Sequence, residues 1–166
     1  SERVTRSFIK EAGQSIILIG GLPEELGGSY FLQTEYGKKE GTCPNVDLAE
    51  EKKIQDFLIS TIDAGQICAA HDIAEGGLLV ALAEMLFEMP ELGVELSIDS
   101  IGNSNRLDAL LFGESQGRVL VSVSSDNKDE VLRIAQKNGL SANYLGTSNT
   151  TGSFKLSVDG NEILDS

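Results

Sequence analysis

Short runs of apolar, β-branched residues and one long stretch with helical periodicity dominate the pattern of the chain. Residues 15–19 read Ser-Ile-Ile-Leu-Ile and are followed by two glycines, which favours a buried strand over a helix. Residues 47–64 repeat apolar side chains at helical spacing from Leu48 onward, with Asp47 placed to cap the first turn and Gly65 placed to end it. The pattern therefore predicts a buried strand and an amphipathic helix early in the chain.

The rest of the chain continues to alternate between the two kinds of element. Residues 94–98 alternate polar and apolar positions, as a half-buried strand does. Further strands are predicted over residues 67–70, 118–123, 143–145 and 154–158, the last leading into an Asp-Gly-Asn turn typical of a hairpin. Further helices are predicted over residues 29–36, 78–89 (apolar nearly all round, buried and ended by Pro90), 105–111 and 129–137 (capped by Ser125 or Asp126).

This alternation sets the fold class, α/β or mixed α+β, with helices packed on one sheet. A chain of 166 residues has the size of one ordinary domain and can bury roughly two thirds of its unfolded surface. We predict a polar lead-in or linker over residues 1–14 and a single α/β domain over residues 15–166. The abrupt polar start suggests a domain cut from a longer chain.

Composition and charge narrow the classes of partner. Hydrophobic residues make up 40% and charged residues 23%, which is typical of a globular protein. No apolar run approaches the ~18 residues of a membrane span, and no charged-then-apolar signal opens the chain. The net charge of −13 leaves no basic stripe for nucleic acid and disfavours anionic membranes. A phosphorylated ligand stays open, because local donors decide such binding.

The cysteines and the histidine suggest a cytoplasmic protein without a metal site of its own. Cys43 and Cys68 lie far apart without C-x-x-C spacing, so two free thiols are expected. His71 is the single histidine, so the chain cannot supply a histidine-rich metal site, and we assign no metal ligand. No serine or cysteine has a histidine at the spacing of a nucleophile motif, and we assign no catalytic residue.

Residues 70–78, AHDIAEGGL, place polar residues between a strand and a helix. Backbone N–H groups at a helix start favour anions, and Gly76 and Gly77 would let a ligand or another backbone approach closely. Asp72 is a further candidate for ligand binding; alternatively, it caps the helix and the glycines allow tight packing. The side chains of His71 and Asp72 should diverge in an extended strand, which argues against a catalytic pair.

Residues 112–118, FGESQGR, lead into an apolar strand. Glu114, Ser115 and Gln116 offer an acceptor, a hydroxyl and an amide, which suits hydrogen bonding to a phosphate or a polyhydroxy ligand. The alternative is a polar loop whose side chains bond nearby backbone groups. The LGGS sequence at residues 26–29 matches no phosphate-binding glycine motif, so a tight turn with a serine cap is the simpler interpretation.

Four segments in this order, LGGSYFLQ, VDLAEEKKIQDFL, AAHDIAEGGLLVALAEM and LLFGESQGRVLVSV, resemble the phosphoribosylformylglycinamidine synthase family. More narrowly, the chain from about residue 15 onward resembles the last domain of the synthetase subunit, a C-terminal domain of the aminoimidazole ribonucleotide synthetase type. Hydrogenase-maturation and selenophosphate-forming relatives share an HD-x-x-x-GG segment but do not pair it with both LGGS and ESQ-x-R. Ala74 stands where the family commonly has serine, which weakens the case for direct phosphate binding by this loop.

The resemblance implies a cytoplasmic ligase that performs an ATP-dependent amidation in purine biosynthesis. With ATP and Mg²⁺, formylglycinamide ribonucleotide and ammonia from glutamine would give the amidine. The implied partners are the preceding domains of the same chain, a glutaminase subunit and a small bridging subunit. The resemblance also implies that the catalytic histidine and the main Mg²⁺ ligands lie in other domains, so this domain would not fully hold ATP or Mg²⁺.

The resemblance also bears on the candidate site. The candidate substrate- or nucleotide-binding residues are Glu114, Ser115, Gln116, Asp72, Gly76 and Gly77. Because the resemblance is to the second half of the synthetase, the corresponding cleft would be suited to a structural nucleotide, and we expect the isolated domain to be inactive. Two alternatives remain open: a free-standing module that binds an anion or a nucleotide, and a purely structural domain.

Overall fold

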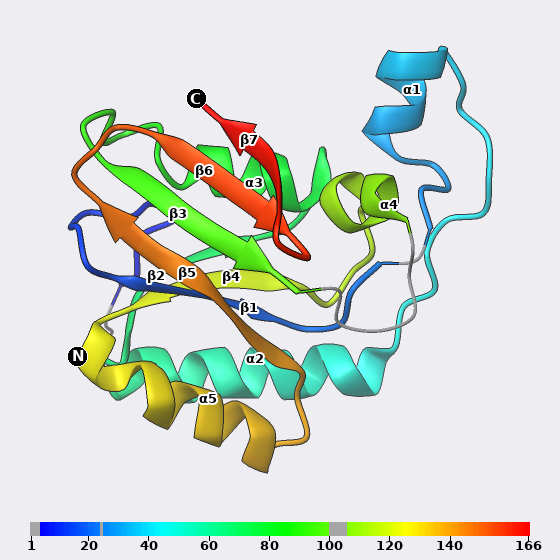
Figure 1. The fold of residues 1–166 in the computed structure, drawn as a ribbon. Coiled ribbons are helices and arrows are strands. Elements are labelled where there is room, and N and C mark those ends of the chain that lie inside the picture. The colour runs from blue at the N-terminus through cyan, green and yellow to red at the C-terminus, as the bar shows by residue number, and fades with distance from the viewer. Residues whose placement is uncertain (1–3, 24, 100–105) are drawn as a thin grey trace.

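The computed structural model describes residues 4–23, 25–99 and 106–166. Within them, seven strands form one sheet in the order β2-β4-β1-β5-β3-β6-β7 (Figure 1). The strands are β1 (Ser15–Ile19), β2 (Ile67–Asp72), β3 (Gly93–Ile98), β4 (Val119–Val123), β5 (Ala142–Asn149), β6 (Phe154–Val158) and β7 (Asn161–Asp165). The helices are α1 (Tyr30–Tyr36), α2 (Leu48–Asp63), α3 (Gly77–Glu84), α4 (Leu107–Phe112), the 3-10 turn η1 (Ser125–Asn127) and α5 (Lys128–Lys137). None of the described helices has the length and apolar character needed to cross a bilayer.

The sheet is mixed, which confirms the predicted fold class. Strand β1 lies inside the sheet between β4 and β5 and is antiparallel to both. Strand β3 pairs antiparallel with β5 and parallel with β6, the one parallel pair among the described strands. Strands β6 and β7 form the predicted hairpin, in which Val158 pairs with Asn161.

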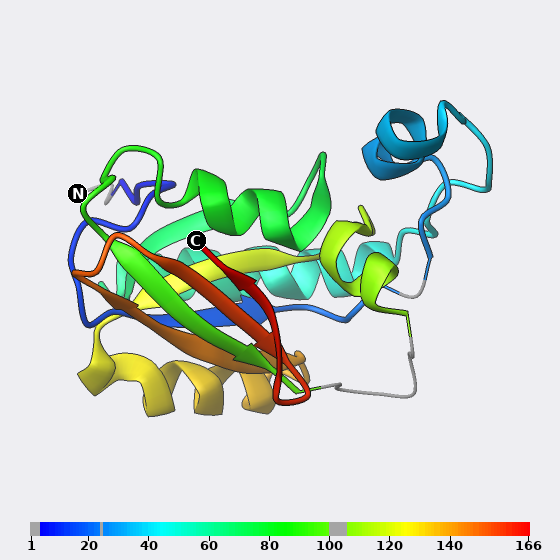
Figure 2. The same ribbon diagram turned by 45° about the horizontal axis from the view of Figure 1, so that its top comes forward.

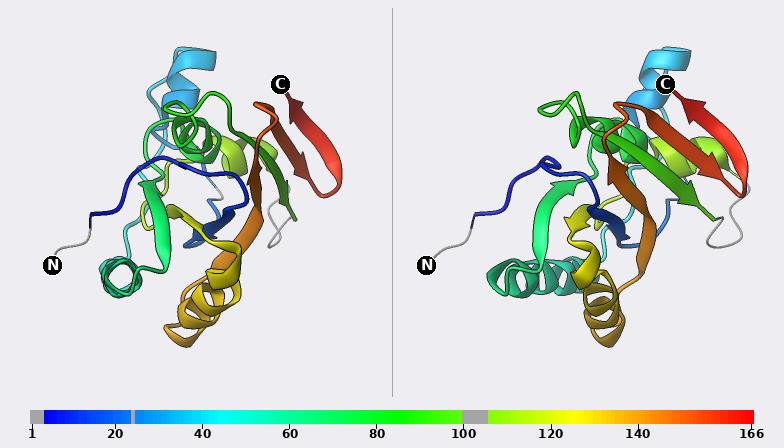
Figure 3. Two further views of the ribbon diagram at one scale, coloured as in Figure 1. Left: turned by 90° about the vertical axis from the view of Figure 1, so that its left-hand side faces the viewer. Right: turned by 60° about the vertical axis from the view of Figure 1, so that its left-hand side comes forward.

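Helices cover the sheet on both faces (Figures 2 and 3), and β1 explains why. Alternate residues of a strand point to opposite faces, and all five residues of β1 are buried. Ile16 and Leu18 belong to a core with residues of α3 and α4. Ile17 and Ile19 belong to a second core with residues of α2 and α5. A strand that is buried on both faces reads as an uninterrupted apolar run, which is the pattern observed in the sequence.

Helix α2 follows its prediction except at its first residue. The Asp47 carboxylate accepts a hydrogen bond from Ala49 N at 2.8 Å and caps the helix. Ile54 and Phe57 are buried against the sheet, as the apolar stripe predicts. Leu48 was expected in that stripe, but its side chain is 78% exposed. It lies in the first turn, beyond the part of α2 that contributes residues to the core.

The segment after β2 differs more from its prediction. Strand β2 continues to Asp72, because its last residue pairs with Val119 of β4. Helix α3 ends at Glu84, so a helix over residues 78–89 stopped by Pro90 is wrong. The carbonyl of Met85, which a longer helix would offer to residue 89, instead accepts a hydrogen bond from Ile9 N at 2.8 Å.

The starts of α5 and α4 also differ from their predictions. Neither Ser125 nor Asp126 caps α5, because both form η1; the N-cap is Asn127, which makes no side-chain capping bond. The helix predicted over residues 105–111 is found as α4 (Leu107–Phe112), and Asn105 lies outside the described residues.

Residues 4–14 pack on the domain. Ile9 is only 1% exposed and belongs to the core with α3. Gln14 is buried, its backbone N–H donates to Ser148 Oγ at 3.0 Å, and its side-chain carbonyl accepts from Ser122 Oγ at 2.9 Å. This segment is therefore tied to both β4 and β5, while a domain boundary at residue 14 stays a prediction.

Helix α1 projects from the body of the domain (Figures 1 and 2) and has no buried residue. The two chain segments that lead to it are in close contact at its base. A Cβ atom added to Gly27 would lie 2.2 Å from the carbonyl oxygen of Thr42. Gly28 N also donates to Glu40 O at 3.0 Å. Only glycine allows the two backbones to approach this closely.

Candidate functional site

Loops that leave the sheet at one end bring the three polar segments of the sequence together. Strand β4 begins at Val119, which pairs with Ile19 at the end of β1 and with Asp72 at the end of β2. Because both pairs are antiparallel, the loops after β1 and β2 lie beside the loop that precedes β4. The sheet topology therefore places residues 26–29, 73–76 and 113–118 near one another.

One carboxylate links these loops. Glu114 Oε1 accepts a hydrogen bond from Tyr30 N and another from Gly76 N, each at 2.8 Å. Tyr30 is the first residue of α1, and Gly76 immediately precedes α3. Bonds from backbone N–H groups to a carboxylate are charge-assisted and stronger than neutral ones. We call Glu114, Tyr30 and Gly76 the Glu114 cluster.

Arg118 holds the loop that carries Glu114, and sequence reasoning missed this role. The Arg118 side chain is 3% exposed. Its Nη2 donates to Gly113 O, and its Nε donates to Ser115 O at 3.1 Å. These two carbonyls flank Glu114, so the guanidinium fixes the backbone on both sides of it. The signal in the sequence was a charged residue at the start of an otherwise apolar strand.

Burial also affects the charge of Arg118. It lowers the pKa of the guanidinium to about 10, and the neighbouring Glu114 carboxylate opposes that shift. The guanidinium is therefore still charged at neutral pH. Its Nη1 is buried and has no hydrogen-bond partner among the described residues. Arg118 thus holds the backbone of the loop through Nε and Nη2, while Nη1 makes no such bond.

Gly76 and Gly77 serve close packing of the chain. Their φ angles are +82° and +73°, values that side chains rarely adopt. A Cβ atom added to Gly77 would lie 2.7 Å from the backbone of Phe112, at the end of α4. The N–H of Gly76 donates to Glu114, so a carboxylate of the chain itself occupies the place that an anion would take at this helix start. A role for either glycine in ligand binding stays a prediction.

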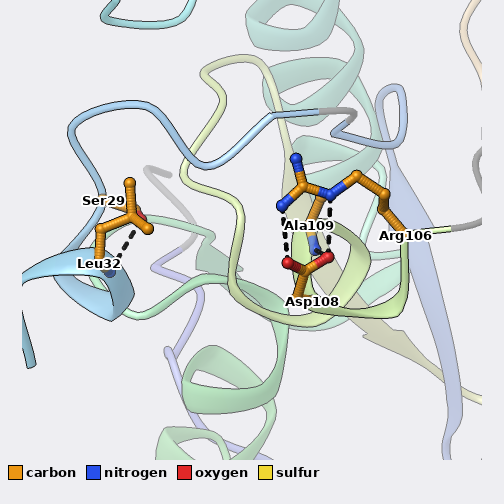
Figure 4. Close-up of polar contacts among 5 residues, drawn as sticks. All are labelled: Ser29, Leu32, Arg106, Asp108 and Ala109. Carbon is orange, nitrogen blue, oxygen red and sulfur yellow. Dashed lines mark hydrogen bonds and ion pairs between the residues drawn. The ribbon is translucent and has the colours of Figure 1, made fainter. Parts of the chain in front are cut away.

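Helices α1 and α4 meet beside the cluster. The rings of Phe31 and Phe112 stack with their centroids 4.5 Å apart. Ser29 Oγ accepts from Leu32 N at 3.4 Å, which confirms the predicted serine cap (Figure 4). Helix α1 is therefore held to α4 by the stacking of Phe31 on Phe112, in addition to the hydrogen bond of Tyr30 in the Glu114 cluster.

The same view shows how α4 begins (Figure 4). Arg106 donates through Nε and Nη2 to the two carboxylate oxygens of Asp108, at 3.1 and 2.6 Å. The Arg106 guanidinium lowers the pKa of Asp108. Asp108 Oδ1 also accepts from Ala109 N at 2.9 Å, so an acidic group stabilises the first turn of α4.

The positions of the His71 and Asp72 side chains differ from the sequence-based expectations, whereas a role of Asp72 in ligand binding stays a prediction. The N-cap of α3 is Gly76, so Asp72 does not cap that helix. The side chains of His71 and Asp72 do not diverge: His71 Nδ1 lies 3.8 Å from Asp72 Oδ1. That nitrogen makes its hydrogen bond with the Asp72 carbonyl at 2.7 Å, and Nε2 lies 3.4 Å from Glu84 Oε2 on α3. Asp72 itself is exposed at the end of β2.

Two hollows adjoin the loop of Glu114. Ser115 and Gln116 line a pocket of about 180 Å³ against the start of α2. Glu114 and Gln116 line a larger, open groove of about 580 Å³ between the base of α1 and the start of α2. Ser115 and Gln116 thus offer polar side chains to these hollows, whereas Asp72, Gly76 and Gly77 line neither.

The charged residues that line the two hollows are mostly acidic. They are Asp47, Glu50, Glu51, Glu114 and Arg118. The carboxylates repel phosphate. The guanidinium of Arg118 bonds the loop through Nε and Nη2. Across the described ranges, no group of three or more His, Cys, Asp or Glu side chains could hold a metal ion.

The fold and the site together define a mixed-sheet α/β domain whose glycine-rich loops gather at one end of the sheet, beside two hollows. The chain belongs to the family described as "AIR synthase related protein, C-terminal domain", which matches residues 11–159. This match confirms the resemblance that the sequence motifs carried.

Two curated relatives carry the same description. The chain is 38% identical over 159 residues to "Phosphoribosylformylglycinamidine synthase subunit PurL" of Symbiobacterium thermophilum, covering 95% of this chain and 20% of that protein. It is 40% identical over 156 residues to the subunit of the same name from Rhodospirillum rubrum, covering 92% of this chain and 20% of that protein. The chain therefore spans about a fifth of the length of these relatives.

Solved structures show the same fold at lower sequence identity. Thermotoga maritima PurL complexed with FGAR superposes with a TM-score of 0.83 at 21% identity, over 98% of this chain and 28% of that one. PurLQS from the same organism gives 0.77 at 21% identity, over 98% and 26%. The hydrogenase maturation protein HypE of E. coli gives 0.70 at 18% identity, over 96% and 51%. At such identities the likeness concerns the fold alone.

Proposed function

We propose that the chain is the C-terminal-type domain of a synthetase that makes formylglycinamidine ribonucleotide in purine biosynthesis. The observation that carries this proposal is the 38–40% identity to curated PurL subunits over more than nine tenths of the chain. The overall reaction replaces the amide oxygen of formylglycinamide ribonucleotide by nitrogen from ammonia. It consumes ATP with Mg²⁺ and releases ADP and phosphate.

In this proposal the domain supplies part of a cleft. The Glu114 cluster keeps the loops at the end of the sheet in a fixed arrangement, and Ser115 and Gln116 are available to contact substrate or nucleotide. The groups that bind Mg²⁺ and most of ATP belong to other domains of the same polypeptide. The glutaminase subunit and the small bridging subunit deliver ammonia to that assembly in the cytoplasm.

A turnover assay tests the first part of the proposal. The purified 166-residue chain is incubated with ATP, Mg²⁺, formylglycinamide ribonucleotide and ammonium, and phosphate release is followed. We expect no release above the background, because the groups that must converge on the reacting phosphate are incomplete here. Full-length PurL of S. thermophilum is the positive control, and robust turnover by the chain alone would overturn the proposal.

Calorimetry separates the proposal from a free-standing nucleotide-binding module. Titrating the chain with ADP and Mg²⁺ should give weak heat or none, because half a cleft leaves most polar groups of the nucleotide unpaired. Tight, saturable, one-to-one binding would favour the free-standing module instead.

A further inference from the structure

We propose that the groove between α1 and α2 receives an arginine or lysine side chain, accompanied by an apolar side chain, from another domain of the longer synthetase. The groove is the one of about 580 Å³ that lies between the base of α1 and the start of α2. The identity of the occupant rests on the proposed function, whereas its chemistry rests on the residues of the groove.

One side of the groove is apolar and uncovered. Pro44, Val46 and Leu48 line it, and Val46 and Leu48 are 51% and 78% exposed. Tyr30 and Tyr36 of α1 are also exposed large side chains on the neighbouring helix. Apolar and aromatic side chains that gather at one exposed place mark a site of protein association more often than a solvated surface.

The other side of the groove is acidic. Glu51 of α2 and Glu114 line it, and the described lining residues include no lysine, arginine or histidine. Both hydrogen bonds of the Glu114 cluster end on Oε1 of Glu114, so a further donor can approach Oε2. The nearest basic residue along α2, Lys52, forms an ion pair with Asp56. Arg118 does not line the groove but offsets part of the charge of Glu114. A group that enters the groove therefore meets the carboxylate of Glu51 and the partly offset carboxylate of Glu114.

The apolar and acidic sides of the groove together favour a basic side chain as its occupant. Two carboxylates repel a phosphate or a nucleotide but attract a cation. A long basic side chain can lay its apolar stem along Val46 and Leu48 while its head reaches Glu51 and Glu114. Arginine fits best, because its guanidinium donates several hydrogen bonds at once and because arginine is enriched where interfaces are strongest.

The size of the relatives indicates where this side chain comes from. The chain spans 20% of the PurL subunits it resembles, so four fifths of such a polypeptide lie outside it. A domain held in that polypeptide meets its neighbours at a high effective concentration, so one basic anchor and an apolar contact suffice to dock them. We therefore assign the occupant to another domain of the same polypeptide rather than to a second copy of this chain.

A peptide titration tests the chemistry of the groove. ¹⁵N-labelled chain is titrated with acetyl-Leu-Arg-amide and, separately, with acetyl-Leu-Gln-amide. Amide shifts at Gly27, Gly28 and Gln55 should saturate in the millimolar range with the arginine peptide and stay small with the glutamine peptide. Equal shifts with the two peptides, or shifts spread over the acidic surface, would overturn the proposal.

Variants with matched controls sharpen that result. Glu51→Gln should weaken the arginine peptide roughly fivefold to tenfold, and Leu48→Ser should weaken it by a few-fold. The controls on the same helix are Asp63→Asn and Ile59→Ser, both at exposed positions outside the groove, and they should leave binding unchanged. Equal weakening by target and control variants would refute a specific site.

Cys43 reports whether another domain covers the groove, because this exposed free thiol lines it. In S. thermophilum PurL with its corresponding segment replaced by this chain, alkylation of Cys43 by N-ethylmaleimide should be at least tenfold slower than in the isolated chain. Glu51→Arg in the same protein should restore the fast rate. Unchanged alkylation in the folded chimera would show an uncovered groove and overturn the proposal.

Protection of Cys43 in the isolated chain that grows with protein concentration would point to a second copy and would also overturn the proposal. No arm of these experiments uses nucleotide or turnover. Their failure therefore leaves the proposed synthetase function standing, and loss of that function would leave the peptide result unaffected.

Discussion

At Glu114, one carboxylate oxygen satisfies two backbone N–H groups that their own helices leave free. The first N–H groups of a helix have no partner within it, and those of Tyr30 and Gly76 lie at or just before the starts of α1 and α3. A negative charge is favoured there because both helix dipoles point their positive ends toward it. An acid at this position therefore stabilises three loops at once.

This arrangement predicts the effect of substitutions at Glu114. Glu114→Ala should lower the free energy of unfolding by about 1–3 kcal/mol, because two N–H groups lose their acceptor at a partly buried site. Glu114→Gln keeps a carbonyl acceptor and should lose less. Urea denaturation measures both, with Glu162→Ala on the exposed strand β7 as the control. Equal stabilities for Glu114→Ala and the control would contradict a structural role for the carboxylate.

Residue roles that depend on near neighbours could be predicted, and those that depend on distant ones could not. The caps by Asp47 and Ser29 act on N–H groups two and three positions away. Glu114 acts on residues 84 and 38 positions away, and no local pattern encodes such a distance. The sequence places the six candidate residues in polar or glycine-rich loops. The hydrogen bonds of Glu114 that connect those loops are visible only in the three-dimensional structure.

At the scale of elements, the start of α3 contacts the end of α4 through a glycine, Gly77. Gly77 faces the backbone of Phe112 without room for a Cβ atom. This contact sets how closely α3 and α4 pack on their face of the sheet, and thereby where Gly76 and Glu114 meet.

Gly77→Ala should accordingly destabilise the domain by more than about 3 kcal/mol, since the new methyl group overlaps backbone and the φ angle is positive. Gly139→Ala is the matched control, because Gly139 has a similar φ of +69° but no atom within 4 Å of the added Cβ. It should cost only about 1–2 kcal/mol, the strain of the φ angle alone. Thermal and urea unfolding compare the two, and similar losses would show that packing at Gly77 is looser than described.

The predicted ends of helices and strands were wrong where tertiary contacts override the local sequence pattern. The apolar run of residues 78–89 continues past Glu84, yet Met85 gives its carbonyl to Ile9 and the helix stops. Strand β2 gains two residues from pairing with β4. By contrast, β1, β3 and α2 were predicted correctly in kind and extent, because burial on both faces, alternation and helical spacing are properties of the local sequence.

At the scale of the whole molecule, the N-terminal segment closes the core. The side chain of Ile9 is buried in the same core as Ala69 of β2 and the apolar residues of α3. The order of the strands, with β1 between β4 and β5 and with β3 parallel to β6, could not be inferred from a pattern that specifies elements but not their neighbours.

Ile9→Ala should therefore cost about 2–5 kcal/mol, the usual range for a large-to-small change in a packed core. Val4→Ala, at a position that is 91% exposed, should stay within about 0.5 kcal/mol of the unchanged protein. Chemical denaturation of both variants gives the comparison, and a small loss for Ile9→Ala would mean that residues 4–14 are a loosely attached lead-in.

The central claim is that this domain completes a synthetase only in the company of other domains. Its most direct test is phosphate release by S. thermophilum PurL in which the corresponding segment is replaced by this chain. We expect turnover that depends on formylglycinamide ribonucleotide, ATP and ammonia, and none from the isolated chain or from PurL without that segment. A chimera that melts like its parent but is no more active than the shortened PurL would contradict the account.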